Sequence, residues 1–222
     1  MKHLFTIIFL LIGFQAPNLE KESAFKEGEW FKFEMSYSGF IKAGNATLSI
    51  NETRLDGKPV FHVIGKGWTT GPVKWMFKVK DRYESYFDKK TGVPYKFIRK
   101  IDEGGHTKDV EINFDHNKRI AEVNNKKKNK VKMIATEQDV QDMVSMYYYL
   151  RNSINIGALI IGDEIETRMF FDEENYGFKL KYLGRETVEV DINGTEVKVK
   201  SLKFRPYVMA GRVFKEEESL TL

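Results

Sequence analysis

The stretch Val188–Val199, VEVDINGTEVKV, holds the clearest turn signal in the chain. Asn193-Gly194 separates two runs in which valine or isoleucine alternates with polar residues. Asn-Gly favours the left-handed backbone of a two-residue hairpin turn. The alternation is typical of strands with one buried face. The stretch therefore predicts an antiparallel β-hairpin.

The same two-residue period continues outward from this hairpin through most of the chain. It predicts strands at 30–38, 41–50, 60–66, 73–88, 95–101, 108–114, 119–124, 131–134, 164–171, 178–183, 186–192, 195–204 and 212–222. In the first of these, Phe31, Phe33, Met35 and Tyr37 are expected on one face. The run 73–88 is longer than a typical strand, so a bend or bulge is expected there.

One segment breaks the alternation. Between residues 137 and 151 the apolar residues follow helical spacing, namely Val140, Met143, Val144, Tyr147 and Leu150. Thr136 and Asp139 resemble a capping box at its start. Asp139 and Asp142 form a carboxylate pair, which is better explained by stabilisation of the helix N-terminus than by acid–base catalysis.

These elements predict an all-β fold that is mainly antiparallel, a barrel-like or sandwich sheet with one short α-helix near 137–151. No long helical segments alternate with the strands, which excludes βαβ units. No Pro/Ser-rich linker divides the chain, so a single domain is expected over 17–222.

The first residues have the pattern of a secretory signal peptide. Lys2 and His3 precede an apolar run from Leu4 to Phe14, and Ala16 is a small residue suited to cleavage. The run is too short for a membrane-spanning helix, and no span is expected in the mature chain. We therefore expect residues 1–16 to be removed and the protein to act in the periplasm or outer envelope.

The composition of the chain excludes several kinds of functional site. The chain of 222 residues contains no cysteine, which excludes disulfides, thiolate metal sites and cysteine nucleophiles. The net charge of +4 is too small an excess to indicate nucleic-acid binding. Its four histidines show no metal-ligand spacing, and no motif for a nucleophile or phosphate loop is present. We predict no metal, no cofactor and no catalytic residue.

Several motifs taken in order resemble the family called domain of unknown function 3108, a family of exported Gram-negative proteins. The matching segments are Phe25–Glu29, Gly39–Gly44, Phe77–Tyr86, Pro94-Tyr95 and Val140–Arg151. The resemblance implies a β-rich, barrel-like fold and an exported location. It implies no activity, because none is established for the family.

The resemblance also has a departure at the C-terminus. Family members continue past the strand at 214–222, whereas this sequence stops at Leu222 within an alternating pattern. The resemblance implies either that the chain is shortened or that the sequence is incomplete; if C-terminal strands are lacking, a sheet edge that should be paired is exposed.

Two groups of residues are candidate binding sites. Trp68, Trp75 and Met76 surround Gly71-Pro72, where aromatic rings could stack on sugars or line a lipid pocket, or could instead fill the core. A basic patch at a hairpin tip could meet anionic lipid or glycan, or could simply be solvated; it consists of Lys126, Lys127, Lys128, Lys130 and Lys132.

The sequence as a whole favours a non-catalytic binding or assembly protein of the cell envelope. Its partner would be a glycan, a lipid or another envelope protein. The alternative is a hydrolase of envelope polymers, whose carboxylates could come from distant strands. A pocket holding two carboxylates would favour the hydrolase, and an aromatic cavity free of carboxylates would favour binding.

Overall fold

The computed structural model describes residues 23–37, 41–208 and 220–221. The first eight strands form one antiparallel sheet in sequence order: β1 (Trp30–Tyr37), β2 (Ile41–Leu55), β3 (Lys58–Thr69), β4 (Lys80–Asp88), β5 (Pro94–Glu103), β6 (His106–Asp115), β7 (Ile120–Asn125) and β8 (Lys130–Ala135). Such a meander needs only short connections, in agreement with the turn signals in the sequence.

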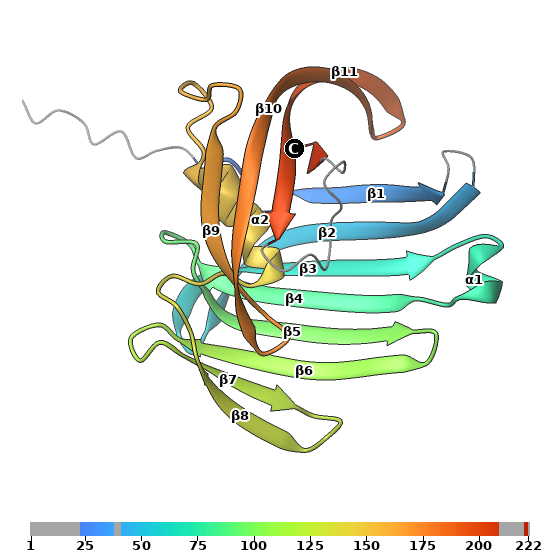
Figure 1. Cartoon of the computed structure of the whole chain (residues 1–222). Helices are drawn as coiled ribbons and strands as arrows, with labels where there is room; N and C mark the ends of the chain where they lie inside the picture. The colour runs from blue at the N-terminus through green and yellow to red at the C-terminus, as the bar shows by residue number, and fades with distance from the viewer. Residues whose placement is uncertain (1–22, 38–40, 209–219, 222) are drawn as a thin grey trace, which may run out of the picture.

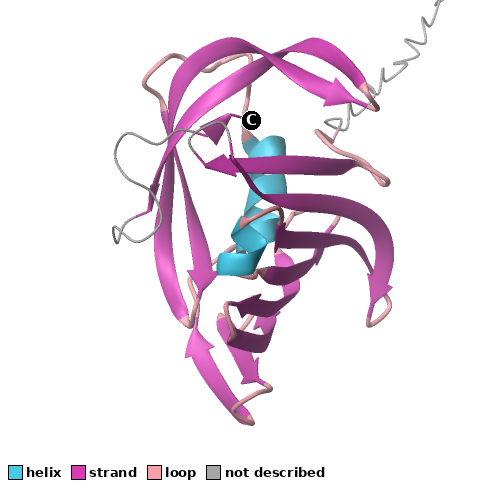
Figure 2. Ribbon diagram, turned by 90° about the vertical axis from the view of Figure 1, so that its right-hand side faces the viewer, coloured by secondary structure: helices cyan, strands magenta, loops and turns pink. Residues whose placement is uncertain are grey.

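A second antiparallel sheet follows, in the order β12-β11-β10-β9. Its strands are β9 (Glu164–Phe171), β10 (Glu174–Ile192), β11 (Thr195–Val208) and β12 (Leu220–Thr221). The helix α2 (Met143–Ser153) lies between the two sheets (Figures 1 and 2). The predicted antiparallel all-β class is confirmed. The arrangement is two open sheets around a helix, and neither sheet closes on itself in its described strand order.

The hairpin turns form where the sequence predicts them. Asn193 and Gly194 have φ of 54° and 84°, and Ile192 pairs with Thr195 across the turn. The two strands predicted at 178–183 and 186–192 are one strand, β10. A register shift interrupts it near Gly184, whose φ of 126° suits an irregular position in a strand.

The long strand predicted over 73–88 is wrong over residues 73–79. Val73–Met76 form a short helix, α1, and the strand β4 begins only at Lys80. Gly71 has a φ of 57° and Pro72 adopts helical angles, so the chain turns here before it can extend. The alternating pattern therefore predicts β4 correctly but not the loop before it.

The helix begins six residues later than predicted. The backbone of Gln141 pairs with β9 instead, since its N–H donates to the Arg168 carbonyl and its carbonyl accepts from Phe170, each over 2.8 Å. This pairing keeps the chain extended as far as Asp142. Asp142 is the helix cap, and it forms a capping box with Ser145. The predicted box at Thr136 and Asp139 is wrong, because Asp139 has a φ of 53°.

Two hydrophobic clusters meet at α2. Val144 and Tyr148 pack with Phe87 and Phe97 of the large sheet. Met146 and Leu150 belong to the other cluster. Its remaining buried members come from the small sheet and are Met169, Phe178, Leu180, Tyr182 and Phe204. Both sides of the helix are therefore buried, one against each sheet.

Strand β1 follows the predicted alternation. The rings of Phe31 and Phe33 stack with centroids 6.0 Å apart, and Phe31 also contacts Tyr147 of α2. Phe31 therefore points toward the helix, whereas Phe33 and Met35 on the same face are 46% and 47% exposed. The side chain of Tyr37 and the predicted signal peptide over 1–16 lie outside the described residues, as does most of the strand predicted at 212–222.

Candidate functional site

The eight-stranded sheet has two faces of different character. The inner face packs on α2 and carries Phe61, Val63, Phe97 and Ile112. We call the opposite side the outer face. Because side chains alternate along each strand, the residues between these apolar positions project from the outer face.

A row of three basic side chains crosses the middle of the outer face. Lys66 of β3 pairs with Arg82 of β4, and Arg82 pairs with Lys100 of β5. The next residue in the row is Asp109 of β6, which lies opposite Lys100. We call Lys66, Arg82 and Lys100 the basic row. Like charges directly opposite each other in neighbouring strands destabilise a sheet, so this row is not explained by stability.

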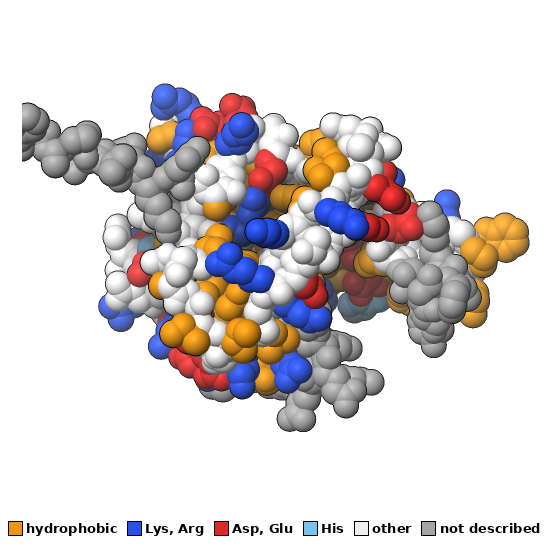
Figure 3. Space-filling view, turned by 90° about the horizontal axis from the view of Figure 1, so that it is seen from above, with side chains coloured by type: hydrophobic (Ala, Val, Ile, Leu, Met, Phe, Trp, Pro, Cys, Tyr) orange, Lys and Arg blue, Asp and Glu red, His pale blue; other side chains and the backbone are white. Residues whose placement is uncertain are grey.

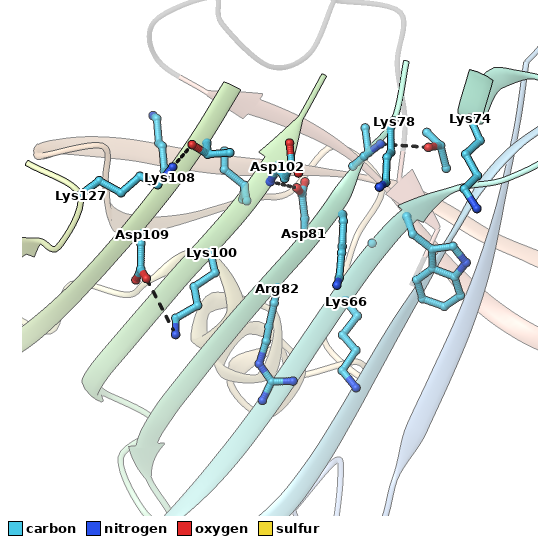
Figure 4. Close-up of a pocket in the computed structure, with 17 residues that line it drawn as sticks. Lys66, Lys74, Lys78, Asp81, Arg82, Lys100, Asp102, Lys108, Asp109 and Lys127 are labelled. Atoms are coloured by element: carbon cyan, nitrogen blue, oxygen red, sulfur yellow. Dashed lines mark hydrogen bonds and ion pairs between the residues drawn. The ribbon is translucent and has the colours of Figure 1, made fainter. Parts of the chain in front are cut away.

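A second row lies beside the basic row, nearer the end of the sheet that carries α1. Trp68 pairs with Lys80, and Asp102 pairs with Thr107. The two rows border an open cavity of about 720 Å³. Figure 4 shows the labelled basic side chains projecting from the strands, with α2 behind the sheet. We call this space the outer-face cavity.

The cavity combines a flat apolar surface with positive charge. Trp68 is half-buried at its border. The basic side chains on its outer-face lining are Lys66, Lys74, Lys78, Lys80, Arg82, Lys100 and Lys127, and the acidic ones are Asp102 and Asp109. Lys108 and Asp81 also border the cavity, but alternation turns their side chains to the inner face, where Lys108 forms an ion pair with Asp172. Positive charge therefore exceeds negative charge along the lining.

The basic row is only partly neutralised. Arg82 Nε donates to Glu84 Oε1 over 2.7 Å, and His62 Nε2 lies 2.8 Å from Glu84 Oε2. Although burial alone would raise it, these two contacts hold the pKa of Glu84 below its usual value. Lys100 lies 3.9 Å from Asp109. Within the described part of the chain, Lys66 has no ion-pair partner.

The carboxylates near the cavity are divided between the two faces. Asp81 is half-buried on the inner side, where burial raises its pKa and the neighbouring Glu103 raises it further. Its Oδ1 accepts a hydrogen bond from the Asp102 N–H over 3.3 Å. Asp102 and Asp109 project from the outer face by the same alternation. The sheet therefore lies between Asp81 and the acidic side chains of the cavity.

The aromatic candidates predicted from sequence are separated by the structure. Trp68 lines the outer-face cavity. Trp75 and Met76 lie on α1 and are 93% and 88% exposed, and neither lines this cavity. Of the three predicted residues, Trp68 therefore lines the cavity, whereas Trp75 and Met76 do not.

The predicted lysine patch is also divided. Lys126, Lys127, Lys128 and Lys130 are exposed at the β7–β8 turn. Lys127 also lines the cavity and donates to Thr107 Oγ1. Lys132 lies on the inner face and forms an ion pair with Glu173 of the β9–β10 turn. It helps to join the two sheets.

The basic row itself is absent from the sequence-based candidates. Its three residues lie far apart in the sequence. Each occupies a polar position in a strand whose polar and apolar residues alternate. The registers of the β3–β4 and β4–β5 pairs bring them side by side. The only signal in the sequence is that three successive predicted strands each carry a basic residue at such a position.

Two further classes of site are absent from the described residues. No group of three or more histidine, aspartate or glutamate side chains is placed to hold a metal ion among residues 23–37, 41–208 and 220–221. Over the same ranges, no helix has the length and apolar character needed to cross a membrane.

Comparison with known proteins identifies a matching family and a similar solved structure. Residues 32–222 match the family described as protein of unknown function (DUF3108). No curated protein matches the chain. The chain is similar to the crystal structure of a beta-barrel-like protein of domain of unknown function DUF1849 from Brucella abortus, at 10% identity and a TM-score of 0.44, over 74% of this chain and 70% of that chain. Neither description states an activity or a ligand.

Proposed function

This chain belongs to the DUF3108 family of proteins of unknown function, and we propose that it is a non-catalytic binding protein for an anionic saccharide, either free or as the headgroup of a lipid. The observation that carries the proposal is the basic row beside Trp68. Three cations stand opposite one another across adjacent strands, at the border of a cavity large enough for a small ligand.

The spacing of the row defines the ligand. Neighbouring strands lie about 4.8 Å apart, so the three cations span roughly 10 Å across the sheet. A ligand with two or more carboxylates or phosphates along that length would neutralise them together. Trp68 offers a flat surface for a sugar ring or the start of an acyl chain.

Binding to matched probes tests the proposal. We expect trigalacturonate to bind and uncharged maltotriose not to bind, because only the former carries carboxylates. Replacing Lys66 and Lys100 by glutamine should weaken trigalacturonate binding at least about a hundredfold, since each charge-assisted hydrogen bond contributes roughly 1.5–3 kcal/mol. Isothermal titration calorimetry measures both effects.

The control removes the same charge elsewhere. Lys58 and Lys90 lie at or beside turns at the opposite end of the large sheet, and their replacement by glutamine should leave the affinity unchanged. Dihexanoylphosphatidylglycerol is the anionic lipid probe, and zwitterionic dihexanoylphosphatidylcholine is its matched control. Binding of the former but not the latter would identify a lipid headgroup, rather than a free glycan, as the source of the ligand. Equal loss in both double variants, or no binding of either anionic probe, would contradict the proposal.

The hydrolase remains the second candidate, because the outer-face cavity holds two carboxylates, Asp102 and Asp109. Burial raises the pKa of Asp81, but Asp81 lies on the other face of the sheet and cannot reach a ligand held in the cavity. The binding proposal predicts that Asp102→Asn with Asp109→Asn does not lose affinity for trigalacturonate and that neither protein cleaves it. Release of reducing ends by the wild-type protein, lost in this double variant, would favour the hydrolase.

We also propose that the protein acts outside the cytoplasm, in the periplasm or outer envelope. The apolar run Leu4–Phe14 before Ala16 supports this location. We expect the mature protein to begin near Ala16. N-terminal sequencing of protein from the cell envelope should therefore find no Phe14; a cytoplasmic product that begins at Met1 would contradict the prediction.

A further inference from the structure

The connection between β3 and β4 carries an exposed apolar tip. Trp75 is 93% exposed, Met76 88% and Phe77 51%, and α1 has no buried residue. The α1 segment projects beyond the neighbouring turns in Figure 1, and hydrophobic side chains cover this projection in Figure 3. Large apolar side chains gathered at one projecting point commonly mark an interaction site.

Hydrogen bonds hold the tip in place. The Phe77 N–H donates to the Val73 carbonyl over 2.8 Å, and the Gly104 N–H of the next turn donates to the Lys78 carbonyl over 2.8 Å. At the base of the loop, the Val79 N–H donates to Thr69 Oγ1 over 2.9 Å. The loop therefore presents Trp75 and Met76 outward on a fixed backbone.

Lysines lie on the tip and on another turn at the same end of the sheet. Lys74 and Lys78 flank the tip in sequence and are exposed. In an up-and-down meander, alternate turns lie at the same end of the sheet, so the β7–β8 turn is at the end that carries α1 (Figure 1). That turn adds Lys126, Lys127 and Lys128, which are also exposed. This end of the sheet therefore presents five exposed lysines together with the exposed indole and thioether.

We propose that this end of the sheet docks on the surface of an anionic lipid bilayer, with Trp75 and Met76 in the headgroup region and the surrounding lysines on lipid phosphates. Indole side chains favour the membrane interface, where an apolar ring meets a polar boundary. Basic residues near an anionic bilayer each add about 1 kcal/mol of attraction. The charge around the tip complements such a surface, and the docking does not depend on a ligand in the outer-face cavity.

Vesicle flotation tests the docking. We expect the protein to float with phosphatidylcholine vesicles that contain about 30% phosphatidylglycerol, and not with phosphatidylcholine alone. Raising the salt from about 0.1 M to about 0.5 M should weaken the binding, because added ions screen the lysines.

Two variants separate the apolar and the electrostatic contributions. Trp75→Ala with Met76→Ala should lower the partition coefficient about tenfold or more, because it removes the side chains that enter the interface. Lys126→Gln with Lys128→Gln, at residues that do not line the outer-face cavity, should lower it by about the same factor on anionic vesicles. Circular dichroism of each variant checks that the fold is retained.

Matched controls lie at the other end of the sheet. Trp30 is 60% exposed at the start of β1, and Trp30→Ala should float like the wild type. Trp68→Ala should also float normally, because Trp68 belongs to the cavity; this separates failure of the docking from failure of the proposed ligand binding.

Three outcomes would overturn the proposal. The first is that the wild type does not float with phosphatidylglycerol vesicles. The second is that Trp75→Ala with Met76→Ala floats as well as the wild type or no worse than Trp30→Ala. The third is that the tip instead joins two copies of the chain, seen as a dimer in analytical ultracentrifugation that the same double variant dissociates while vesicle binding is absent.

Discussion

Val144→Asp is expected to lower the free energy of unfolding by roughly 3–5 kcal/mol, because it buries an unpaired charge. Val144 is 6% exposed and lies in the cluster between α2 and the large sheet, beside Tyr148 and Phe87. Urea-induced unfolding followed by circular dichroism measures the loss.

Val131→Asp is the matched control, since it makes the same change on the outer face of β8. Val131 is 56% exposed, and an exposed substitution of this kind usually changes stability by no more than about 0.5 kcal/mol. If the two variants unfold at the same urea concentration, the buried face of α2 is assigned wrongly.

The second large effect concerns Asp142. Its carboxylate is fully buried at the start of α2 and accepts hydrogen bonds from Ser85 Oγ at 2.6 Å, from the Val144 N–H at 2.7 Å and from the Ser145 N–H at 2.8 Å. It therefore joins the helix to strand β4 of the large sheet while it caps the helix.

Asp142→Ala should lower the free energy of unfolding by about 2–4 kcal/mol, because it leaves three buried donors without a partner. Asp142→Asn keeps an acceptor oxygen for the helix N–H groups and should retain much more of the stability. Urea unfolding at neutral pH compares the two variants. Equal losses would show that the charge, and not the cap, stabilises this junction.

The pH dependence of the same residue has a definite sign. Burial raises the pKa of Asp142 from 3.8 to about 6, although the hydrogen bonds from Ser85 and from the Ser145 and Val144 backbone oppose the rise. Between these two values the folded protein holds a proton that the unfolded chain has lost. The contribution of Asp142 to stability is therefore fully present below about pH 4 and is lost as the pH rises through about 6.

The difference in unfolding free energy between the wild type and Asp142→Asn isolates this effect. It should fall by up to about 3 kcal/mol between pH 4 and pH 7, because each unit of pKa shift corresponds to about 1.4 kcal/mol. A difference that rises with pH would mean that the hydrogen bonds outweigh burial.

The parts of the fold that depend on local chemistry could be predicted from the sequence. The turns at Asp56-Gly57 and Asn193-Gly194 adopt the left-handed angles that their residues favour. The alternation of Phe31 and Phe33 correctly indicates which side of β1 faces the core.

The start of α2 could not be predicted, because a distant strand determines it. The apolar spacing that begins at Val140 is real, but Gln141 pairs with residues on either side of Met169, almost thirty positions further along the chain. Tertiary pairing thus overrides the local preference for helix over residues 137–142.

The basic row could not be predicted for a similar reason. Lys66, Arg82 and Lys100 each occupy a polar position of a different strand, and only the registers of two strand pairs bring them side by side. A shift of one residue in either register would turn one of them to the other face. Sequence reasoning instead selected Trp68. Trp68 lines the same cavity as the basic row, but its position in the sequence does not reveal those basic neighbours.

The most direct test of the central claim is a chemical-shift map of the wild-type protein titrated with trigalacturonate. The account predicts that the largest backbone amide changes fall on the three strand segments bordering the outer-face cavity, around Lys66–Trp68, Lys80–Arg82 and Lys100–Asp102. Maltotriose should leave the same signals unmoved. Changes centred on α2 or on strands β9 to β11, or equal changes with both sugars, would contradict it.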